Sequence, residues 1–325
     1  MINSKFGIVL ISGVFLIVSC SIEPKPEVAA DQRPVKAEKK ITTPEFNADS
    51  AYLFTKQQVD FGPRVPGTKA HARCAEYLFN KFKNYKLDVR IQTGTIQTFD
   101  SKQFKLKNII ASYKPELSSR ILLCAHWDSR PFADEDTKDK DKPIDAASDG
   151  AAGVGILLEF ARHLDTIPPN TGVDIILFDL EDYGNSGDAN TWCLGSQYWS
   201  HNPHKPDYTA KFGVLLDMVG AKDATFPKES HSVEYASAFV DKVWNTASNL
   251  GYSAYFPAET INFVGVDDHI WVNKAGVPCM DIIQYDKTNG GFARYHHTHE
   301  DNMSLINRST LKAVGQTLLE VIYQQ

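Results

Sequence analysis

Several apolar runs in this chain stop at an acidic residue or a histidine, and this pattern constrains the fold more than any other feature. Open α/β sheets bind their ligands at the carboxyl ends of their strands, so such a run places its last side chain in a shared crevice. The residues placed in this way are His126, Asp128, Asp149, Glu181, Asp182, Asp217, Asp267, Asp268, His269 and His297. The sequence therefore predicts a zinc site, with catalytic acids beside it, at one edge of a sheet.

Segments with helical and extended patterns alternate along the chain. Helical spacing covers residues 46–59, 67–84, 150–164, 188–201, 232–250 and 308–323, with a short helix after Asp267. Extended segments cover 87–99, 104–113, 120–127, 174–180, 213–217 and 278–284. The first two are typical of antiparallel strands near an edge, whereas the third is continuously apolar and should be buried on both faces. This order predicts an α/β fold, in which a central, mostly parallel mixed sheet is flanked by helices on both faces.

Composition and charge exclude two classes of protein. Of the 325 residues, 42% are hydrophobic and 11% are aromatic, which excludes a chain that is disordered throughout. The formal net charge of -6 gives no reason to expect a nucleic-acid partner. We therefore expect a globular protein with no nucleic acid among its ligands.

The N-terminal region has the pattern of an export signal. Lys5 precedes an apolar run at 6–18, which is too short to span a bilayer and is typical of a signal peptide. The residues at 16–20 read Leu-Ile-Val-Ser-Cys and resemble a bacterial lipobox, in which Cys20 becomes the lipid-modified first residue. The alternative is a plain secretory signal or short anchor with Cys20 incidental. We expect a signal peptide at 1–19 and an exported protein, lipid-anchored to a bacterial membrane and facing the periplasm or the cell surface.

Residues 20–43 are rich in Pro, Lys and Glu and lack aromatic residues, which predicts a disordered tether. Strands and helices then alternate without a break, so we expect a single catalytic domain at 44–325. This domain contains Cys74, Cys124, Cys193 and Cys279. Cys124 and Cys279 fall within apolar strands and are expected to be buried thiols. The sequence leaves open whether any of the four forms a disulfide.

Each candidate residue also has a purely structural explanation. Asp149 stands at the start of a helix, where an N-cap is a common role for aspartate. Glu181 and Asp182, closely preceded by Asp179, end an apolar strand; alternation would point one to a metal and the other to the substrate as a base. A structural ion pair there would need a cation that the local sequence does not supply. His297 lies in the run His-His-Thr-His at 296–299, which could be a surface cluster.

The order of the motifs is more specific than any one of them. Along the chain come His-x-Asp at 126–128, Ser-Asp-Gly-Ala-Ala-Gly at 148–153, the acidic pair, Leu-Leu-Asp-Met-Val-Gly at 215–220 and His-Thr-x-x-Asp-Asn at 297–302. This succession resembles the co-catalytic zinc aminopeptidases over nearly the whole domain. Within that superfamily the chain most resembles the animal-type glutaminyl cyclases, which also occur in bacteria. Val-Asp-Asp-His-Ile at 266–270, followed by Gly-Val-Pro at 276–278, carries most of that distinction.

The resemblance implies a role for each matching residue. Glu181 would be the general acid/base of the reaction. Asp217 and Asp267 would form a hydrogen-bonded acid pair beside the substrate. The zinc ion, one per chain, would be held by Asp149, Asp182 and His297.

Further positions can be compared with the same family. Phe292 falls where the family has an apolar wall of the substrate pocket. His126 with Asp128 matches the superfamily's His-x-Asp, in which the aspartate orients the histidine from outside the ligand shell. The disulfide of animal members has no counterpart, because Cys124 stands one residue off and Val154 fills the partner position.

Three departures concern the metal and the pocket. Asp182 stands where the family usually has a glutamate ligand, so the ligand is one methylene shorter and the metal or the loop must shift. His296 replaces a pocket tryptophan just before the histidine ligand. Gly187 replaces a second pocket tryptophan, and Trp192 is the nearest residue that could take its place. These changes affect the expected shape of the pocket more than its chemistry.

The activity implied by the resemblance is conversion of an N-terminal glutamine of a peptide or protein to pyroglutamate with release of ammonia. Zinc would polarise the γ-carbonyl group. Glu181 would move a proton from the α-amino group to the leaving ammonia, while Asp267, held by Asp217, would orient the leaving amide.

Two alternatives remain open. In a di-zinc aminopeptidase, His126 and Asp217 would hold a second zinc bridged by Asp149, and metal-bound water would be the nucleophile. A protein of another class, a non-catalytic surface lipoprotein, could retain the fold without the activity.

Overall fold

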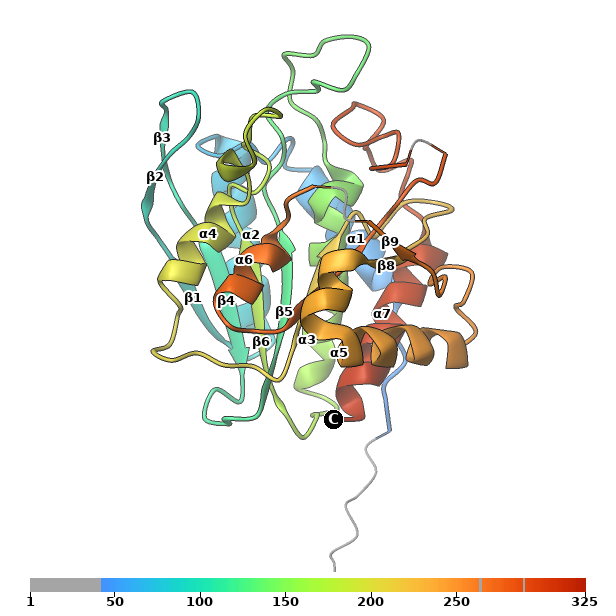
Figure 1. The fold of residues 1–325 in the computed structure, drawn as a ribbon. Coiled ribbons are helices and arrows are strands. Elements are labelled where there is room, and N and C mark those ends of the chain that lie inside the picture. Colours follow the sequence, from blue (N-terminus) through green and yellow to red (C-terminus); the bar gives the residue numbers. More distant parts are fainter. Residues whose placement is uncertain (1–41, 263–264, 289) are drawn as a thin grey trace, which may run out of the picture. The chain divides into compact units, whose positions relative to one another are not determined.

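The core of the computed structural model, which describes residues 42–262, 265–288 and 290–325, is a six-stranded sheet (Figure 1). In spatial order its strands are β1 (Asp88–Gln92), β4 (Asn108–Tyr113), β6 (Gly172–Phe178), β5 (Arg120–His126), β7 (Gly213–Asp217) and β10 (Cys279–Ile283). β4 is antiparallel to both of its neighbours, whereas β6, β5, β7 and β10 run parallel. This confirms the predicted mixed sheet, with its antiparallel strands near one edge. The predicted signal peptide, Cys20 and nearly all of the tether lie outside the described residues.

β5 and β6 occupy the centre of the sheet and are buried at every position. Their side chains alternate between two apolar cores. Leu123 and Ile175 belong to the larger core, whereas Cys124 and Ile176 belong to the smaller one on the opposite face. The continuous apolar pattern of residues 120–127 therefore indicated a strand buried on both faces correctly.

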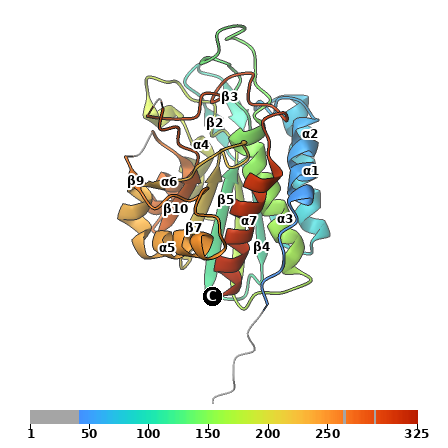
Figure 2. The same ribbon diagram turned by 90° about the vertical axis from the view of Figure 1, so that its right-hand side faces the viewer.

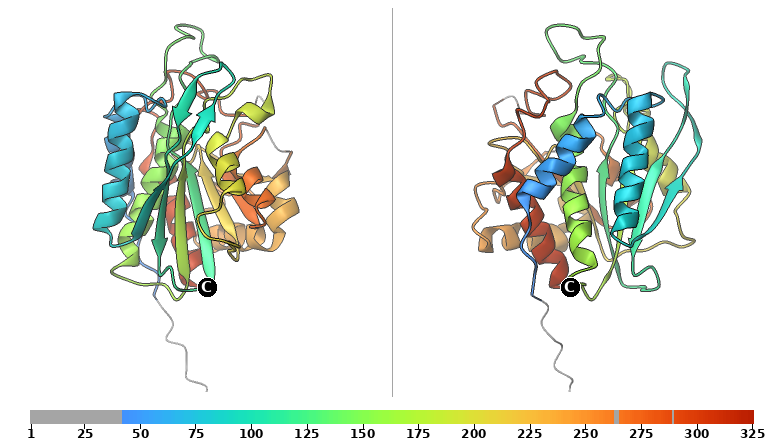
Figure 3. Two further views of the ribbon diagram at one scale, coloured as in Figure 1. Left: turned by 90° about the vertical axis from the view of Figure 1, so that its left-hand side faces the viewer. Right: turned by 180° about the vertical axis from the view of Figure 1, so that it is seen from behind.

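Helices cover both faces of this sheet, as Figures 2 and 3 show from three further sides. The larger core is completed by α1 (Ala48–Val59), α2 (Lys69–Asn84), α3 (Gly153–Leu164), α5 (Ser230–Asn249) and α7 (Arg308–Tyr323). The opposite face is covered by α4 (Leu194–His201) and α6 (Asp268–Lys274). Side chains of Asn47, Thr68 and Asn307 accept hydrogen bonds from main-chain N–H groups in the first turns of α1, α2 and α7, and these caps fix where the helices begin.

Some elements differ in extent from those predicted. Each of the two extended segments expected at 87–99 and 104–113 divides in two, which adds a hairpin of β2 (Thr95–Gln97) and β3 (Gln103–Lys105). The strand expected to reach residue 180 ends at Phe178. A second short pair, β8 (Lys228–Glu229) with β9 (Thr260–Ile261), was not predicted, because two-residue strands carry no periodic signal.

Two expected helices begin later than predicted. The segment from residue 188 is a 3-10 turn, Ala189–Thr191, before α4 starts. The segment from residue 150 is part of a π-helical turn, Ala147–Ala152, and α3 starts only after it. Asp149 has φ -104° and ψ 82°, which are not helical angles and which interrupt the helix at this residue.

The cysteines bear on a further expectation, and the lengths of the helices add one observation. Cys74, Cys124, Cys193 and Cys279 are free and buried, as the pattern predicted for Cys124 and Cys279. Within the described ranges, no helix is both long enough and apolar enough to cross a membrane.

Candidate metal and catalytic site

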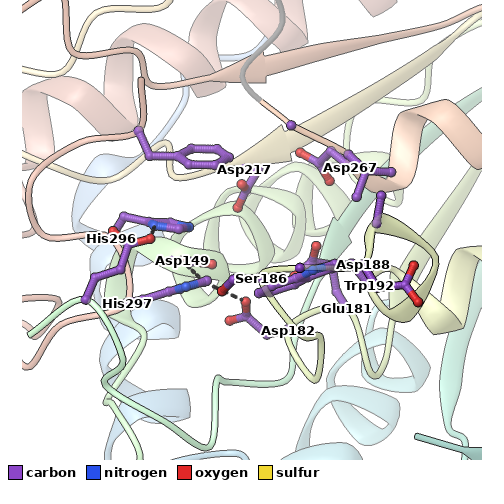
Figure 4. A pocket seen from close by; sticks show the side chains of 16 residues that line it. Asp149, Glu181, Asp182, Ser186, Asp188, Trp192, Asp217, Asp267, His296 and His297 are labelled. Carbon is purple, nitrogen blue, oxygen red and sulfur yellow. Dashed lines mark hydrogen bonds and ion pairs between the residues drawn. The ribbon is translucent and has the colours of Figure 1, made fainter. Parts of the chain in front are cut away.

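A cavity of about 460 Å³ lies beyond the carboxyl ends of β6 and β7 (Figure 4). It is lined by all the residues predicted to bind metal, to provide acid chemistry or to contact substrate: Asp149, Glu181, Asp182, Trp192, Asp217, Asp267, Phe292, His296 and His297. His126 and Asp128 are buried next to these residues and do not belong to the lining. The fold therefore gathers residues that are far apart in the sequence into one site.

The three predicted metal ligands converge in the cavity. His297 Nε2 lies 3.1 Å from Asp182 Oδ1 and 3.9 Å from Asp149 Oδ2, and Figure 4 shows both carboxylates beside the imidazole. Asp182 Oδ2 is buried and has no hydrogen-bond partner among the residues that the structure describes. Burial and the charge of the neighbouring His296 lower the pKa of His297, which favours the neutral imidazole that binds metal. Two carboxylates and one neutral imidazole fit a zinc ion with an open position, and the partnerless oxygen belongs to one of these carboxylates.

Asp301 holds the turn that presents Asp149. Its two carboxylate oxygens accept hydrogen bonds from the main-chain N–H groups of Ser148, at 2.7 Å, and Asp149, at 3.1 Å. Asp301 is fully buried, and it belongs to the same His-Thr-x-x-Asp-Asn motif as His297. One loop therefore supplies a predicted metal ligand and also fixes the main chain of a second predicted ligand. Asp301 stands within the motif, but the sequence pattern predicts no role for it.

The acidic pair lies on a turn and not on a strand. β6 ends at Phe178, and Leu180 adopts a left-handed conformation with φ 58°. The carboxylate of Asp128 accepts hydrogen bonds from the N–H groups of Glu181, at 3.1 Å, and Asp182, at 3.3 Å. The prediction that strand alternation separates the two acids was therefore wrong. Their different directions arise from a turn that Asp128 holds in place.

Asp179, the first acid of the series, has a structural role. Its carboxylate lies 2.8 Å from His71 Nε2, and both side chains are buried. Asp179 also accepts a hydrogen bond from the main-chain N–H of Lys107 at 2.8 Å. The local sequence could not supply this partner, because it comes from α2, far away along the chain.

His126 lies at the centre of several carboxylates. Its Nε2 is 3.0 Å from Asp149 Oδ1 and 3.2 Å from Asp217 Oδ1, while its Nδ1 is 3.8 Å from both Asp128 and Glu181. Burial opposes protonation, but the hydrogen bonds to these acids raise the pKa of His126 well above its usual range. Two ligand atoms of one tetrahedral zinc are about 3.3 Å apart. The contacts of Nε2 therefore fit both a protonated histidine and the second metal of the aminopeptidase alternative.

Glu181 is a buried acid at the cavity wall. Burial and the charge of Asp182 raise its pKa well above the usual range, as a group that must both take and give a proton requires. The thiol of Cys193 donates a hydrogen bond to Glu181 Oε1 at 3.3 Å. This contact could not be predicted, because no motif surrounds Cys193 in the sequence.

The two further acids lie on the same wall. Asp217 ends β7, and Asp267 caps α6 by accepting a hydrogen bond from the N–H of Asp268 at 2.5 Å. Burial and the nearby charge of Asp217 raise the pKa of Asp267 to about 7. The two carboxyl groups therefore influence each other, and their direct hydrogen bond stays a prediction. Asp217 contacts His126, as described above.

Aromatic rings stack along one wall of the cavity. The rings of Phe292 and His296 are 4.2 Å apart with an angle of 14° between their planes, and those of His296 and His297 are 3.5 Å apart. The Trp192 ring lies parallel to His297 at 5.6 Å, and the Arg130 guanidinium lies 4.5 Å from the Trp192 ring. Glu135 Oε1 lies 3.0 Å from His296 Nδ1. Trp192 therefore does line the pocket, as Gly187 does.

Comparison with known proteins places this arrangement among zinc enzymes. The model of peptidase family M28 matches residues 108–322. The structure of Tannerella forsythia glutaminyl cyclase is similar with a TM-score of 0.84 and 50% identity, over 87% of this chain and 100% of that one. A Zn-dependent exopeptidase from Parabacteroides distasonis is similar with a TM-score of 0.85 and 47% identity, over 87% and 100% of the two chains.

Two curated relatives represent both candidate activities. Glutaminyl-peptide cyclotransferase of Bos taurus is 24% identical over 284 residues, which is 78% of this chain and 76% of the relative. Aminopeptidase YwaD of Bacillus subtilis is 25% identical over 222 residues, which is 67% of this chain and 44% of the relative. The chain thus matches less than half the length of that aminopeptidase.

Proposed function

The chain belongs to peptidase family M28, and from this premise we propose that it is a zinc-dependent glutaminyl-peptide cyclotransferase. Its substrates are peptides or proteins with an N-terminal glutamine, and its products are the pyroglutamyl peptide and ammonia. The single observation that carries this assignment is the position of Asp267, which is buried and lines the cavity together with Glu181 and Asp217. Water-driven peptide hydrolysis has no need of this third acid, whereas a leaving carboxamide needs an acceptor for its N–H groups. The likeness to Tannerella forsythia glutaminyl cyclase at 50% identity supports the same assignment.

One zinc ion per chain fits the converging ligands Asp149, Asp182 and His297. When bound there, zinc supplies a Lewis acid for the γ-carbonyl oxygen of the substrate glutamine. The remaining chemistry belongs to side chains of the protein.

Glu181 moves the proton in both halves of the reaction. It takes a proton from the α-amino group, which attacks the carbon of the side-chain carboxamide in the same molecule and forms the C–N bond of a five-membered ring. It then returns a proton to the departing nitrogen, and the old C–N bond breaks with release of ammonia. The raised pKa of Glu181 suits a group that works in both directions near neutral pH.

Asp267 orients the leaving group. As a carboxylate at the cavity wall it accepts a hydrogen bond from the carboxamide nitrogen and so holds the rotamer in which the amine can attack. Trp192 and Phe292 enclose the glutamine side chain and exclude water, which would otherwise compete with the amine.

Ammonia release tests this assignment directly. With a glutaminyl dipeptide as substrate, we expect stoichiometric ammonia and pyroglutamyl product from protein that contains about one zinc per chain. We expect no cleavage of leucine anilide under the same conditions. Anilide cleavage by protein with two zinc ions would instead establish the aminopeptidase.

A specific observation favours that aminopeptidase as the second candidate. His126, Asp149 and Asp217 are close enough to act as ligands of one further zinc, as their separations of 3.0 and 3.2 Å indicate. Counting bound metal separates the two activities, because the cyclase requires one ion and the aminopeptidase two. A zinc-bound protein inactive on both substrates would point to a non-catalytic lipoprotein.

We also propose that the protein is exported and anchored to the membrane through a lipid on Cys20. The lipobox-like sequence at 16–20 and the polar segment after it support this. In a bacterial host, Cys20→Ser is expected to abolish incorporation of labelled fatty acid and to move the protein out of the membrane fraction, while ammonia release stays unchanged. Fatty-acid labelling that persists in Cys20→Ser would disprove the assignment of this cysteine.

A further inference from the structure

A second group of ionisable side chains lies behind Asp267 and has no part in the chemistry described so far. Asp281 belongs to β10, the neighbour of β7; His269 belongs to α6, and Glu229 belongs to β8. All three are fully buried at 0% exposure, whereas Asp267 is 6% exposed and lines the cavity. Buried acids in an apolar sheet require a partner or a proton.

Contacts within this group connect it to Asp267. A carboxylate oxygen of Asp267, one of Asp281 and a ring nitrogen of His269 lie within 4.8 Å of one another. His269 Nδ1 is 3.9 Å from Asp281 Oδ2, while Nε2 is 3.2 Å from Glu229 Oε1. Glu229 therefore contacts one nitrogen of the imidazole, and Asp281 lies close to both the other nitrogen and Asp267.

Glu229 is itself fixed and charged. It caps α5 and accepts a hydrogen bond from the N–H of His231 at 2.7 Å. Burial opposes ionisation, but the hydrogen bond and the charge of His269 lower the pKa of Glu229. The imidazole of His269 therefore has Glu229 as its nearer carboxylate, at 3.2 Å against 3.9 Å for Asp281.

In the part of the chain that the structure describes, the carboxyl groups of Asp281 and Asp267 lack a hydrogen-bond donor between them. Among the described residues, no donor reaches either side-chain oxygen of Asp281 or Oδ2 of Asp267. Two ionised carboxylates cannot lie side by side in a buried site without a donor, because desolvation and repulsion both oppose it. A proton on one of them satisfies both, since a protonated carboxyl group donates and an ionised one accepts.

We propose that Asp281 is a neutral carboxylic acid that donates a hydrogen bond to Asp267 and thereby positions Asp267 for the leaving amide. The proton belongs to Asp281 because it is the deeper of the two acids, whereas Asp267 faces the cavity and must accept from the substrate. Burial and the charge of Asp267 raise the pKa of Asp281 well above its usual range, in agreement with this geometry. Asp281 acts through Asp267 and is a positioning residue. The kinetic role of this proton depends on the proposed cyclase function, whereas its presence does not.

A matched pair of substitutions tests the role. Asp281→Asn keeps the shape and an N–H donor for Asp267, whereas Asp281→Leu keeps the volume and removes the donor. We expect Asp281→Asn to retain kcat within about threefold, and Asp281→Leu to lower kcat by about 10- to 100-fold with little change in KM. An equal loss in both variants would mean that the acid itself is needed, and an unchanged kcat in Asp281→Leu would mean that Asp281 does not act on Asp267. Either result would overturn the proposal.

Infrared spectroscopy tests the proton without any assay. The difference spectrum between wild-type protein and Asp281→Asn at neutral pH should contain the carbonyl stretch of a protonated carboxyl group, which shifts in D₂O. Absence of that band would disprove the proton even if Asp281→Leu fails to fold.

Zinc counting covers the remaining possibility, a metal ion held by Asp267, His269 and Asp281. A zinc ion lost specifically in Asp281→Asn would overturn the proposal in favour of that metal. If the band is present but ammonia is not released, the proposed cyclase function fails and the shared proton stands.

Discussion

Replacing Glu181 by Gln is expected to lower kcat for ammonia release by about 10²- to 10⁴-fold while the zinc content stays at the wild-type value. The amide has the size of the acid and can still accept the hydrogen bond from Cys193, which is 3.3 Å away in the wild-type protein. It cannot take the proton of the attacking amine or return one to the leaving nitrogen. Zinc stays bound because Asp149, Asp182 and His297 are unchanged.

The measurement is kcat with a glutaminyl dipeptide, together with the metal content of the dialysed protein. Glu76→Gln provides the matched control, because Glu76 is exposed on α2, and we expect wild-type kcat from it. Loss of zinc from Glu181→Gln would show that Glu181 is a ligand. The assignment of the two adjacent acids would then have to be exchanged.

Replacing Asp182 by Ala is expected to remove both the zinc ion and measurable turnover. Asp182 Oδ1 lies 3.1 Å from His297 Nε2, the other predicted ligand, and in the described part of the chain its second oxygen has no partner that would compete with a metal. A site reduced from three protein ligands to two binds zinc far more weakly. Zinc per chain after dialysis, measured beside the unfolding temperature, separates loss of the metal from loss of the fold.

Asp182→Glu is the informative companion. It keeps the carboxylate and adds one methylene, so we expect zinc to remain bound with kcat reduced, because the metal is displaced relative to Glu181 and the substrate. Retention of zinc by Asp182→Ala would contradict the ligand assignment. The metal would then belong to His126, Asp149 and Asp217, because the carboxylates of Asp149 and Asp217 lie 3.0 and 3.2 Å from His126 Nε2.

The strands and the directions of their ends could be predicted because burial on both faces leaves a continuous apolar signal. Residues 120–127 and 213–217 correspond to β5 and β7 almost without error; Asp217 at the end of β7 lines the cavity, and His126 at the end of β5 contacts Asp217. Parallel strands carry their last side chains to the same edge, so this part of the site follows from pattern and topology alone. The family resemblance then added roles that the pattern could not assign.

The remaining parts of the site depend on contacts between distant residues, and no local pattern announces them. Asp301 binds the main chain before Asp149, and Asp128 binds the main chain of Glu181, through geometry that exists only in the folded chain. The partner of Asp179 is His71, which lies on α2. Asp281 interrupts an apolar strand, so a buried acid could have been predicted there. That Asp281 lies next to Asp267 follows only from the packing of α6 against β10.

The proposed ligand set also has a consequence for the order in which parts of the site are synthesised. Its members stand at positions 149, 182 and 297, and Asp301, which fixes the turn of the first ligand, comes later still. A chain leaving the ribosome therefore has its sheet strands long before it can close the metal centre. Any product that stops short of residue 297 lacks a ligand, however well its sheet has formed. Retention of the metal consequently marks a chain whose synthesis has passed that loop, and prematurely terminated products should be recognisable as metal-free.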